Sequence, residues 1–61
     1  MYEVGKTYFL NIDDEIYFGK FVGYCSACNT ILQFDYRVDS KTKRSVLFTR
    51  KEAEVNVLNV V

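Results

Sequence analysis

The chain has 61 residues, of which 49% are hydrophobic and 26% charged, values typical of a globular rather than a disordered protein. A chain of this length buries only about 60% of the surface that it exposes when unfolded, so we expect a single domain over residues 1–61 without a deep enclosed active site. The longest uncharged stretch, between Lys20 and Asp35, is interrupted by Gly, Ser, Asn and Thr, and Glu3 and Lys6 interrupt any signal peptide. We therefore expect a cytoplasmic protein with no membrane-spanning segment.

Eight Lys and Arg residues balance eight Asp and Glu residues, so the net charge is zero. A protein that coats nucleic-acid backbones usually carries a clear excess of Lys and Arg, which this chain lacks. The charges are unevenly placed, because residues 1–36 hold five acids and two bases, whereas residues 37–51 hold six of the eight bases. This distribution suits oriented association with a partner, although two solvated loops would give the same pattern.

The first two strand-like runs are separated by an acidic turn. Residues 6–12 (KTYFLNI) are rich in aromatic and β-branched types, and the three adjacent carboxylates at 13–15 predict a turn after them. Residues 16–24 (IYFGKFVGY) form a second strand with apolar side chains on both faces. Gly19 and Gly23 fall on one face of this strand, which predicts a bend or bulge.

Two further strands follow a loop at residues 25–29. Residues 30–38 (TILQFDYRV) alternate between apolar and polar types, and residues 44–48 (RSVLF) follow a polar turn at 39–43. The apolar set of the third strand is expected to face the core: Leu32, Phe34, Tyr36 and Val38.

The end of the chain combines a helix start with an apolar strand. Thr49 and Glu52 have the spacing of a capping box, but only two residues follow before the segment Val55–Val61, so we expect a single 3₁₀ turn rather than a full helix. Read as a strand, Val55–Val61 has apolar side chains on both faces and none of the devices that protect an edge. We therefore expect a homo-oligomer that pairs or covers this strand. The alternative, within one chain, is that the C-terminus packs back across the mouth of a small barrel.

This order of elements resembles that of the SH3-like small barrels, a group that includes SH3, Tudor, KOW and Sm-like domains. The resemblance covers nearly the whole chain and implies an all-β fold, a five-stranded SH3-like small barrel with one short 3₁₀ turn before the last strand. An OB-like barrel is the alternative, although it usually has a longer chain and a longer helix between its third and fourth strands. In size and style the chain also resembles short accessory proteins encoded by phages and other viruses.

Few residues favour catalysis or metal binding. Cys25 and Cys28 could form half of a tetrahedral zinc site, but the chain has no third Cys and no His, so a second subunit would have to complete it. Unliganded turn thiols and a disulfide are the alternatives. The adjacent carboxylates at 13–15 diverge and have no positioned base or nucleophile beside them. We expect no enzyme activity and no cofactor.

Ten of the 61 residues are Phe or Tyr, more than a small core can enclose. Alternation places Phe18, Phe34 and Phe48 in the core with either Tyr8 or Phe9. The remaining tyrosines are expected to be partly exposed, with the phenol reaching water: Tyr2, Tyr17, Tyr24 and Tyr36.

Two binding functions fit these features. The first is docking on a protein partner through a Tyr-rich face and a basic rim, which the neutral net charge favours. The second is binding of single-stranded nucleic acid or RNA through residues 37–51, with a tyrosine stacking on bases. The candidate binding residues for both are Tyr17, Tyr36, Arg37, Lys41, Lys43, Arg44, Arg50 and Lys51.

Overall fold

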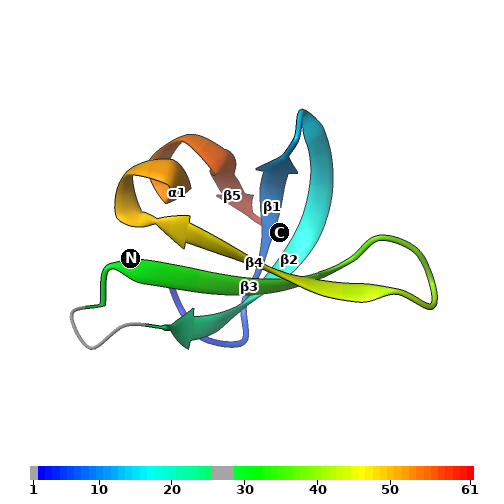
Figure 1. The fold of residues 1–61 in the computed structure, drawn as a ribbon, viewed down its shortest axis with the longest axis horizontal. Helices are drawn as coiled ribbons and strands as arrows, with labels where there is room; N and C mark the ends of the chain where they lie inside the picture. The colour runs from blue at the N-terminus through cyan, green and yellow to red at the C-terminus, as the bar shows by residue number, and fades with distance from the viewer. Residues whose placement is uncertain (1, 26–28) are drawn as a thin grey trace.

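A computed structural model describes residues 2–25 and 29–61. The chain forms five strands and one helix, in the order β1 (Thr7–Ile12), β2 (Glu15–Tyr24), β3 (Ile31–Arg37), β4 (Lys43–Thr49), α1 (Arg50–Asn56) and β5 (Val57–Val60). All strand pairs are antiparallel, and the order across the sheet is β4-β3-β2-β1-β5. The prediction of an all-β fold with five strands is confirmed. The sheet is curled but not closed, with β4 and β5 as its two edges (Figure 1).

Turn chemistry explains the first hairpin. Asp13 and Asp14 both have positive φ angles, +52° and +66°, and they connect Ile12 to Glu15, which are paired. A two-residue turn with both central residues in the left-handed region matches the right-handed twist of the flanking strands, and Asp tolerates that region well. The acidic run is therefore a tight turn, as predicted, although Glu15 already belongs to β2.

The core lies on the concave side of the sheet under the helix. Its buried members come from all five strands and the helix, and they are Tyr8, Leu10, Phe21, Leu32, Phe34, Phe48, Ala53 and Val57. Tyr2, in the segment before β1, covers this cluster and packs edge-on against Tyr8 and Phe34. The Tyr8 hydroxyl accepts a hydrogen bond from the Glu3 backbone N–H at 2.9 Å, so the buried phenol is satisfied.

The face of strand β2 that packs on the core is not the one that carries Phe18. It is the face that carries Gly19 and Phe21. Phe18 is 64% exposed and Phe21 only 1%, so the expectation of a core Phe18 is wrong. The face that carries Gly19 is the inner one, because Leu10 occupies the space where a side chain at position 19 would lie. The predicted bulge is confirmed: the register with β3 shifts between Phe21 and Gly23, and Gly23 has φ +132°.

The last segment also differs from expectation. The predicted 3₁₀ turn is a seven-residue α-helix, Arg50–Asn56, and Val55 and Asn56 belong to it rather than to the last strand. The capping box itself is present, since the Thr49 hydroxyl accepts from the Glu52 N–H at 3.2 Å and the Glu52 carboxylate accepts from the Thr49 N–H at 2.9 Å. This cap and the buried Ala53 stabilise a second turn of helix, so strand β5 is shorter than the predicted Val55–Val61.

We expect Gly19→Ala to destabilise the protein by about 1–3 kcal/mol, because an added methyl group overpacks the core. A Cβ at position 19 would lie 2.2 Å from Leu10 Cδ1, and Leu10 is fully buried, so it has no free space into which to move. Denaturant unfolding measures the change, with Lys20→Ala as a control at the next, exposed position, expected within about 0.5 kcal/mol of wild type. Equal unfolding midpoints for both variants would show that the core accommodates the methyl group.

Candidate functional site

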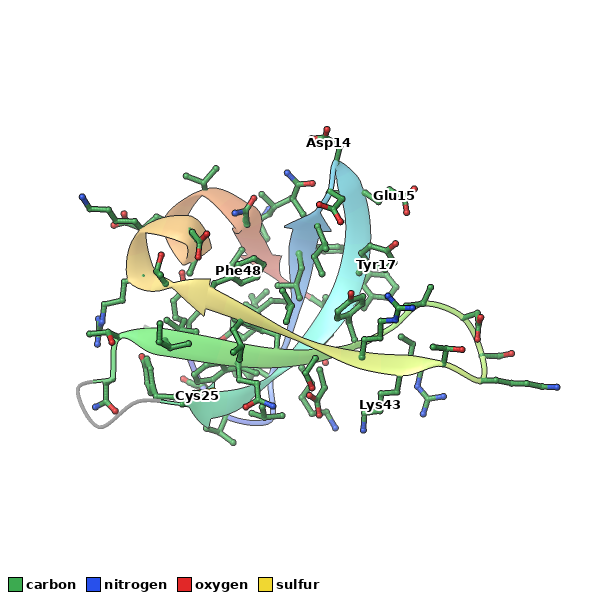
Figure 2. The ribbon with its side chains drawn as sticks, viewed as in Figure 1. Asp14, Glu15, Tyr17, Cys25, Lys43 and Phe48 are labelled. Atoms are coloured by element: carbon green, nitrogen blue, oxygen red, sulfur yellow. The ribbon has the colours of Figure 1, made fainter. Side chains whose placement is uncertain are left out.

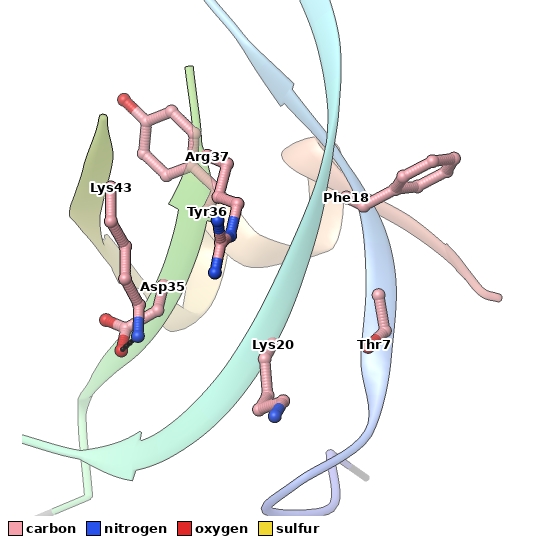
Figure 3. A pocket seen from close by; sticks show the side chains of 7 residues that line it. All are labelled: Thr7, Phe18, Lys20, Asp35, Tyr36, Arg37 and Lys43. Atoms are coloured by element: carbon pink, nitrogen blue, oxygen red, sulfur yellow. Dashed lines mark ion pairs between the residues drawn. The ribbon is translucent and has the colours of Figure 1, made fainter. Parts of the chain in front are cut away.

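The candidate site is a hollow on the outer, convex face of the sheet near the β3–β4 hairpin, and we call it the hairpin hollow. It has a volume of about 350 Å³. Strands β1 to β4 contribute its lining, which consists of Thr7, Phe18, Lys20, Asp35, Tyr36, Arg37 and Lys43 (Figure 3).

The strand register explains why these residues meet. Thr7 pairs with Lys20, Lys20 with Asp35, and Asp35 with Ser45, so one row of outward-facing side chains crosses four strands. Arg37 pairs with Lys43 in the next outward row. Alternation therefore brings side chains that are far apart in the sequence to one surface.

The charges of the hairpin hollow are only partly compensated. Asp35 accepts a hydrogen bond from the Ser45 hydroxyl at 2.7 Å and lies 3.9 Å from the Lys43 amine, a long and largely exposed ion pair. Lys20 makes no ion pair with the described residues, and the Arg37 guanidinium donates only a long hydrogen bond of 3.3 Å, to the Ser40 carbonyl. Three cations beside one carboxylate thus leave a net positive surface that can receive an anionic group.

Two aromatic pairs lie near this positive surface, one on each face of the sheet. Figure 3 shows Arg37 over the space between β3 and β2, with Phe18 across β2 from it. Phe18 packs against Phe9 with ring centroids 5.2 Å apart, and both lie on the outer face. Tyr36 packs against Tyr17 with ring centroids 5.0 Å apart, and both rings are partly exposed. Tyr17 pairs with the buried Leu10, and Tyr36 pairs with Gly19, so alternation places this pair on the inner face of the sheet. The aromatic contact beside the outward-facing cations is therefore Phe18.

Hydrogen bonds hold Tyr17 and the hairpin turn in place. The Tyr17 hydroxyl donates to the Glu15 carboxylate at 2.7 Å, and this bond raises the pKa of Tyr17 above its ordinary value. The Asp39 carboxylate accepts from the backbone N–H groups of Lys41 and Thr42, both at 2.8 Å, and these bonds lower the pKa of Asp39. Asp39 thus remains ionised in the turn that orients the hairpin.

The structure brings together only some of the predicted binding residues. Tyr36, Arg37 and Lys43 line the hairpin hollow, whereas Tyr17 contacts it only through Tyr36. Lys41 lies in the exposed turn, and Arg44 projects from the other side of β4, in register with Tyr36.

Arg50 and Lys51 belong to a different surface. Both lie at the start of α1, at the opposite end of the seven-residue strand β4, a separation of roughly 20 Å along the strand. The Arg50 guanidinium is already engaged, since it donates to the Asn29 carbonyl at 2.8 Å and lies 5.6 Å from the centroid of the Tyr24 ring. A second hollow of about 490 Å³ lies beside it, lined by Tyr2, Tyr24, Leu32, Arg50 and Glu54. We favour the hairpin hollow because its cations have few partners.

Four residues of the hairpin hollow were missed by sequence reasoning: Thr7, Phe18, Lys20 and Asp35. The sequence does contain a signal for Phe18 and Lys20. The two residues share one face of their strand, and a lysine indicates that this face is exposed to solvent. Thr7 and Asp35 could be found only from the strand register.

The acidic turn and the cysteine loop lie away from this site. Figure 2 shows Asp14 and Glu15 at the tip of the β1–β2 turn, on the far side of the molecule from Lys43. Within residues 2–25 and 29–61, no three His, Cys, Asp or Glu side chains are grouped so that they could hold a metal ion. Cys25 is exposed, and its thiol donates to the Gln33 side-chain carbonyl at 3.0 Å. Cys28, the other half of the considered zinc or disulfide pair, lies outside the described residues.

Comparisons of the chain with protein-family models, with curated proteins and with solved structures give no match. In the part of the chain that the structure describes, no helix is long and apolar enough to cross a membrane.

We expect the Cys25 thiol to react promptly with a thiol reagent in the native protein, because the side chain is exposed. Cys25→Ser should change the free energy of unfolding by no more than about 0.5 kcal/mol, as for other surface substitutions. Reaction with a chromogenic thiol reagent and denaturant unfolding measure the two quantities. Stoichiometric zinc release during the thiol reaction, or failure of the variant to fold, would instead indicate a structural metal site.

Proposed function

We propose that this protein is a non-enzymatic binding module that docks on a protein partner through the hairpin hollow, with the Tyr17–Tyr36 pair on the inner face of the same strands as a second contact. The observation that carries the proposal is the combination in one hollow of the exposed Phe18 ring with cations that have only long contacts or none among the described residues. Charge-assisted hydrogen bonds from Arg37 and Lys20 would hold a carboxylate of the partner, and Phe18 would pack against the apolar part of the same segment.

The distribution of charge supports a protein partner over nucleic acid. The basic side chains of residues 37–51 form two groups, one at the hairpin and one on α1, rather than a continuous stripe. Apolar side chains are exposed on the same face as the hairpin hollow, among them Ile16, Phe18 and Leu47, which are all more than half exposed. A mixed surface with an apolar patch is typical of protein interfaces, whereas a nucleic-acid site usually presents a basic track along the backbone.

We propose that the fold is an SH3-like small barrel. The position of the helix between β4 and β5, and the curled β2 that pairs with both β1 and β3, support an SH3-like small barrel rather than an OB-like one. A small barrel of this kind presents its binding surface on hairpins and strand faces. We further propose a cytoplasmic accessory protein of the phage or viral type, on the basis of the short chain and the exposed free thiol of Cys25.

Capture of the partner tests the docking proposal. Immobilised wild-type protein should retain one or more proteins from a lysate of its source cells, and nuclease treatment should leave them bound. Arg37→Glu should reduce the retained amount roughly tenfold, as expected for the loss of about one charge-assisted hydrogen bond. Quantitative mass spectrometry measures the change.

Lys51→Glu is the matched control for this experiment. It makes the same charge reversal at an exposed lysine on α1, outside the hairpin hollow, and should leave capture unchanged. Equal capture by the Arg37 variant and the wild type would contradict the proposal. Retention that disappears with nuclease, together with a mobility shift of single-stranded DNA or RNA at low salt, would establish the nucleic-acid alternative.

A second association, between copies of this chain, is proposed for residues 57–61. Strand β5 is an edge of the sheet, and Leu58, Val60 and Val61 are 46%, 53% and 64% exposed. Among residues 57–61 there is no charged side chain or proline that would protect such an edge. Pairing of two β5 edges about a two-fold axis would cover these side chains.

Light scattering after size exclusion checks this self-association. We expect the wild type to have the mass of a dimer at micromolar concentration and Leu58→Lys to have that of a monomer, because a buried lysine at the interface is costly. Leu47→Lys is the control, since Leu47 is an exposed leucine on the other edge strand, 56% exposed against 46% for Leu58. A monomer mass for the wild type would rule out the β5 interface.

A further inference from the structure

We propose that the open edge of β4 binds an extended, acidic segment of the protein partner as an added sixth strand. This inference rests on the proposed docking function and specifies the partner segment. The segment would place a carboxylate beside Lys43 and an apolar side chain beside Leu47.

Strand β4 is free to accept another strand. It is the last strand of the sheet, and among the described elements it contacts only β3 and the helix that follows it. Figure 1 shows β4 lying along β3 from the hairpin at one end to α1 at the other. Residues 43–45 and Leu47 are exposed, so most of the strand is accessible from its open side.

The register identifies the backbone groups on this open side. The Val38 N–H donates to the Thr42 carbonyl at 2.9 Å, and β3 and β4 are paired without a shift from Arg37–Lys43 to Ile31–Thr49. In an antiparallel ladder, hydrogen-bonded and non-hydrogen-bonded pairs alternate. The peptide groups of Lys43, Ser45 and Leu47 therefore point away from β3, toward the position that an added strand would occupy.

The side chains of this edge indicate the chemistry of the segment. The Lys43 amine has only its long contact of 3.9 Å with Asp35, and the Arg44 guanidinium makes no hydrogen bond or ion pair with the described residues. A lysine on an edge discourages pairing with neutral or basic strands. An acidic strand, in contrast, gains from both cations, and Lys43 also lines the hairpin hollow, so one segment can contact the edge and the hollow together.

The spacing of the edge residues predicts a sequence pattern. Lys43 and Leu47 lie four residues apart on the outer face, with Ser45 between them. Side chains of an added strand also alternate, so the segment would need an acidic and an apolar residue four positions apart, in either chain direction.

A display library of random peptides, each long enough to pair along all of β4, tests the proposal by selection on the wild-type protein. We expect the selected peptides to be acidic and to share the four-residue spacing of acidic and apolar residues. Ser45→Pro should weaken their binding at least tenfold, because the proline ring removes an outward N–H and blocks the edge. Ser45→Ala is the matched control: it also loses the hydroxyl that bonds Asp35, but it keeps the edge open and should bind as the wild type does.

The outcomes separate this inference from the docking function. Peptides that bind the Ser45→Pro and wild-type proteins equally, or that lack an acidic residue, overturn the edge inference. If the Arg37→Glu variant nevertheless fails to bind those peptides or the captured partner, the docking function stands while the edge inference fails. Capture that does not respond to Arg37→Glu, in contrast, contradicts the docking function itself.

A measurement on the wild-type protein covers the case in which Ser45→Pro does not fold. A selected peptide is N-methylated on one or the other alternate set of its amides. One set should weaken binding at least tenfold and the other should have little effect, because only alternate amides of an added strand face β4. Equal effects of the two sets overturn the proposal.

Discussion

The close contact between Gly19 and Leu10 determines how the rest of the sheet is built. Leu10 is fully buried, and its side chain fills the space that a Cβ on Gly19 would need. Because only a glycine leaves this space free, Gly19 lies on the inner face of β2. Its neighbour Phe18 therefore points outward. One missing methyl group thus places a large aromatic ring on the surface beside Lys20.

The surface aromatics follow from this constraint. Ten aromatic rings exceed what the core of a small domain can enclose, and the structure gives the inner positions to Tyr8, Phe21, Phe34 and Phe48. Phe34 is the centre of this group, since it makes an edge-on contact with Tyr8 and tilted contacts with Phe21 and Phe48, and these contacts supply much of the packing of a small core. Of the rings left outside, Phe18 lies next to the cations of the hairpin hollow, whereas Tyr2 and Tyr24 line the second hollow beside Arg50.

Sequence patterns predicted the elements better than the faces. Turn chemistry at Asp13–Asp14, alternation in β3 and the capping box at Thr49 each act over a few residues, and each appears in the structure. The orientation of β2 could not be predicted in this way, because Ile16, Phe18 and Val22 on one face look as suitable for a core as Tyr17 and Phe21 on the other. Only the packing against Leu10 on β1 decides between them. The length of the helix was underestimated for a similar reason. Val55 favours a strand locally, but the cap and the buried Ala53 stabilise a second helical turn.

The candidate site was predictable to the extent that it lies within one hairpin. Arg37 and Lys43 are close in sequence and meet across a turn, whereas Lys20 and Asp35 meet them only through the β2–β3 register. The length of β4 separates Arg50 and Lys51 from the hairpin, although these residues are part of one basic segment in the sequence.

The two edges of the open sheet differ in chemistry, and each of the two proposed associations uses one of them. β4 presents lysine and arginine next to an apolar residue, so its charge selects among strands that could pair with it. β5 presents only Asn59 as a polar side chain between exposed apolar residues, so it has no charge with which to exclude a copy of itself. Because the edges lie at opposite ends of the strand order, pairing at β5 leaves β4 and the hairpin hollow accessible. A dimer formed through β5 would then carry two hairpin hollows, and a partner with two matching acidic segments would bind it more tightly than it binds a single chain.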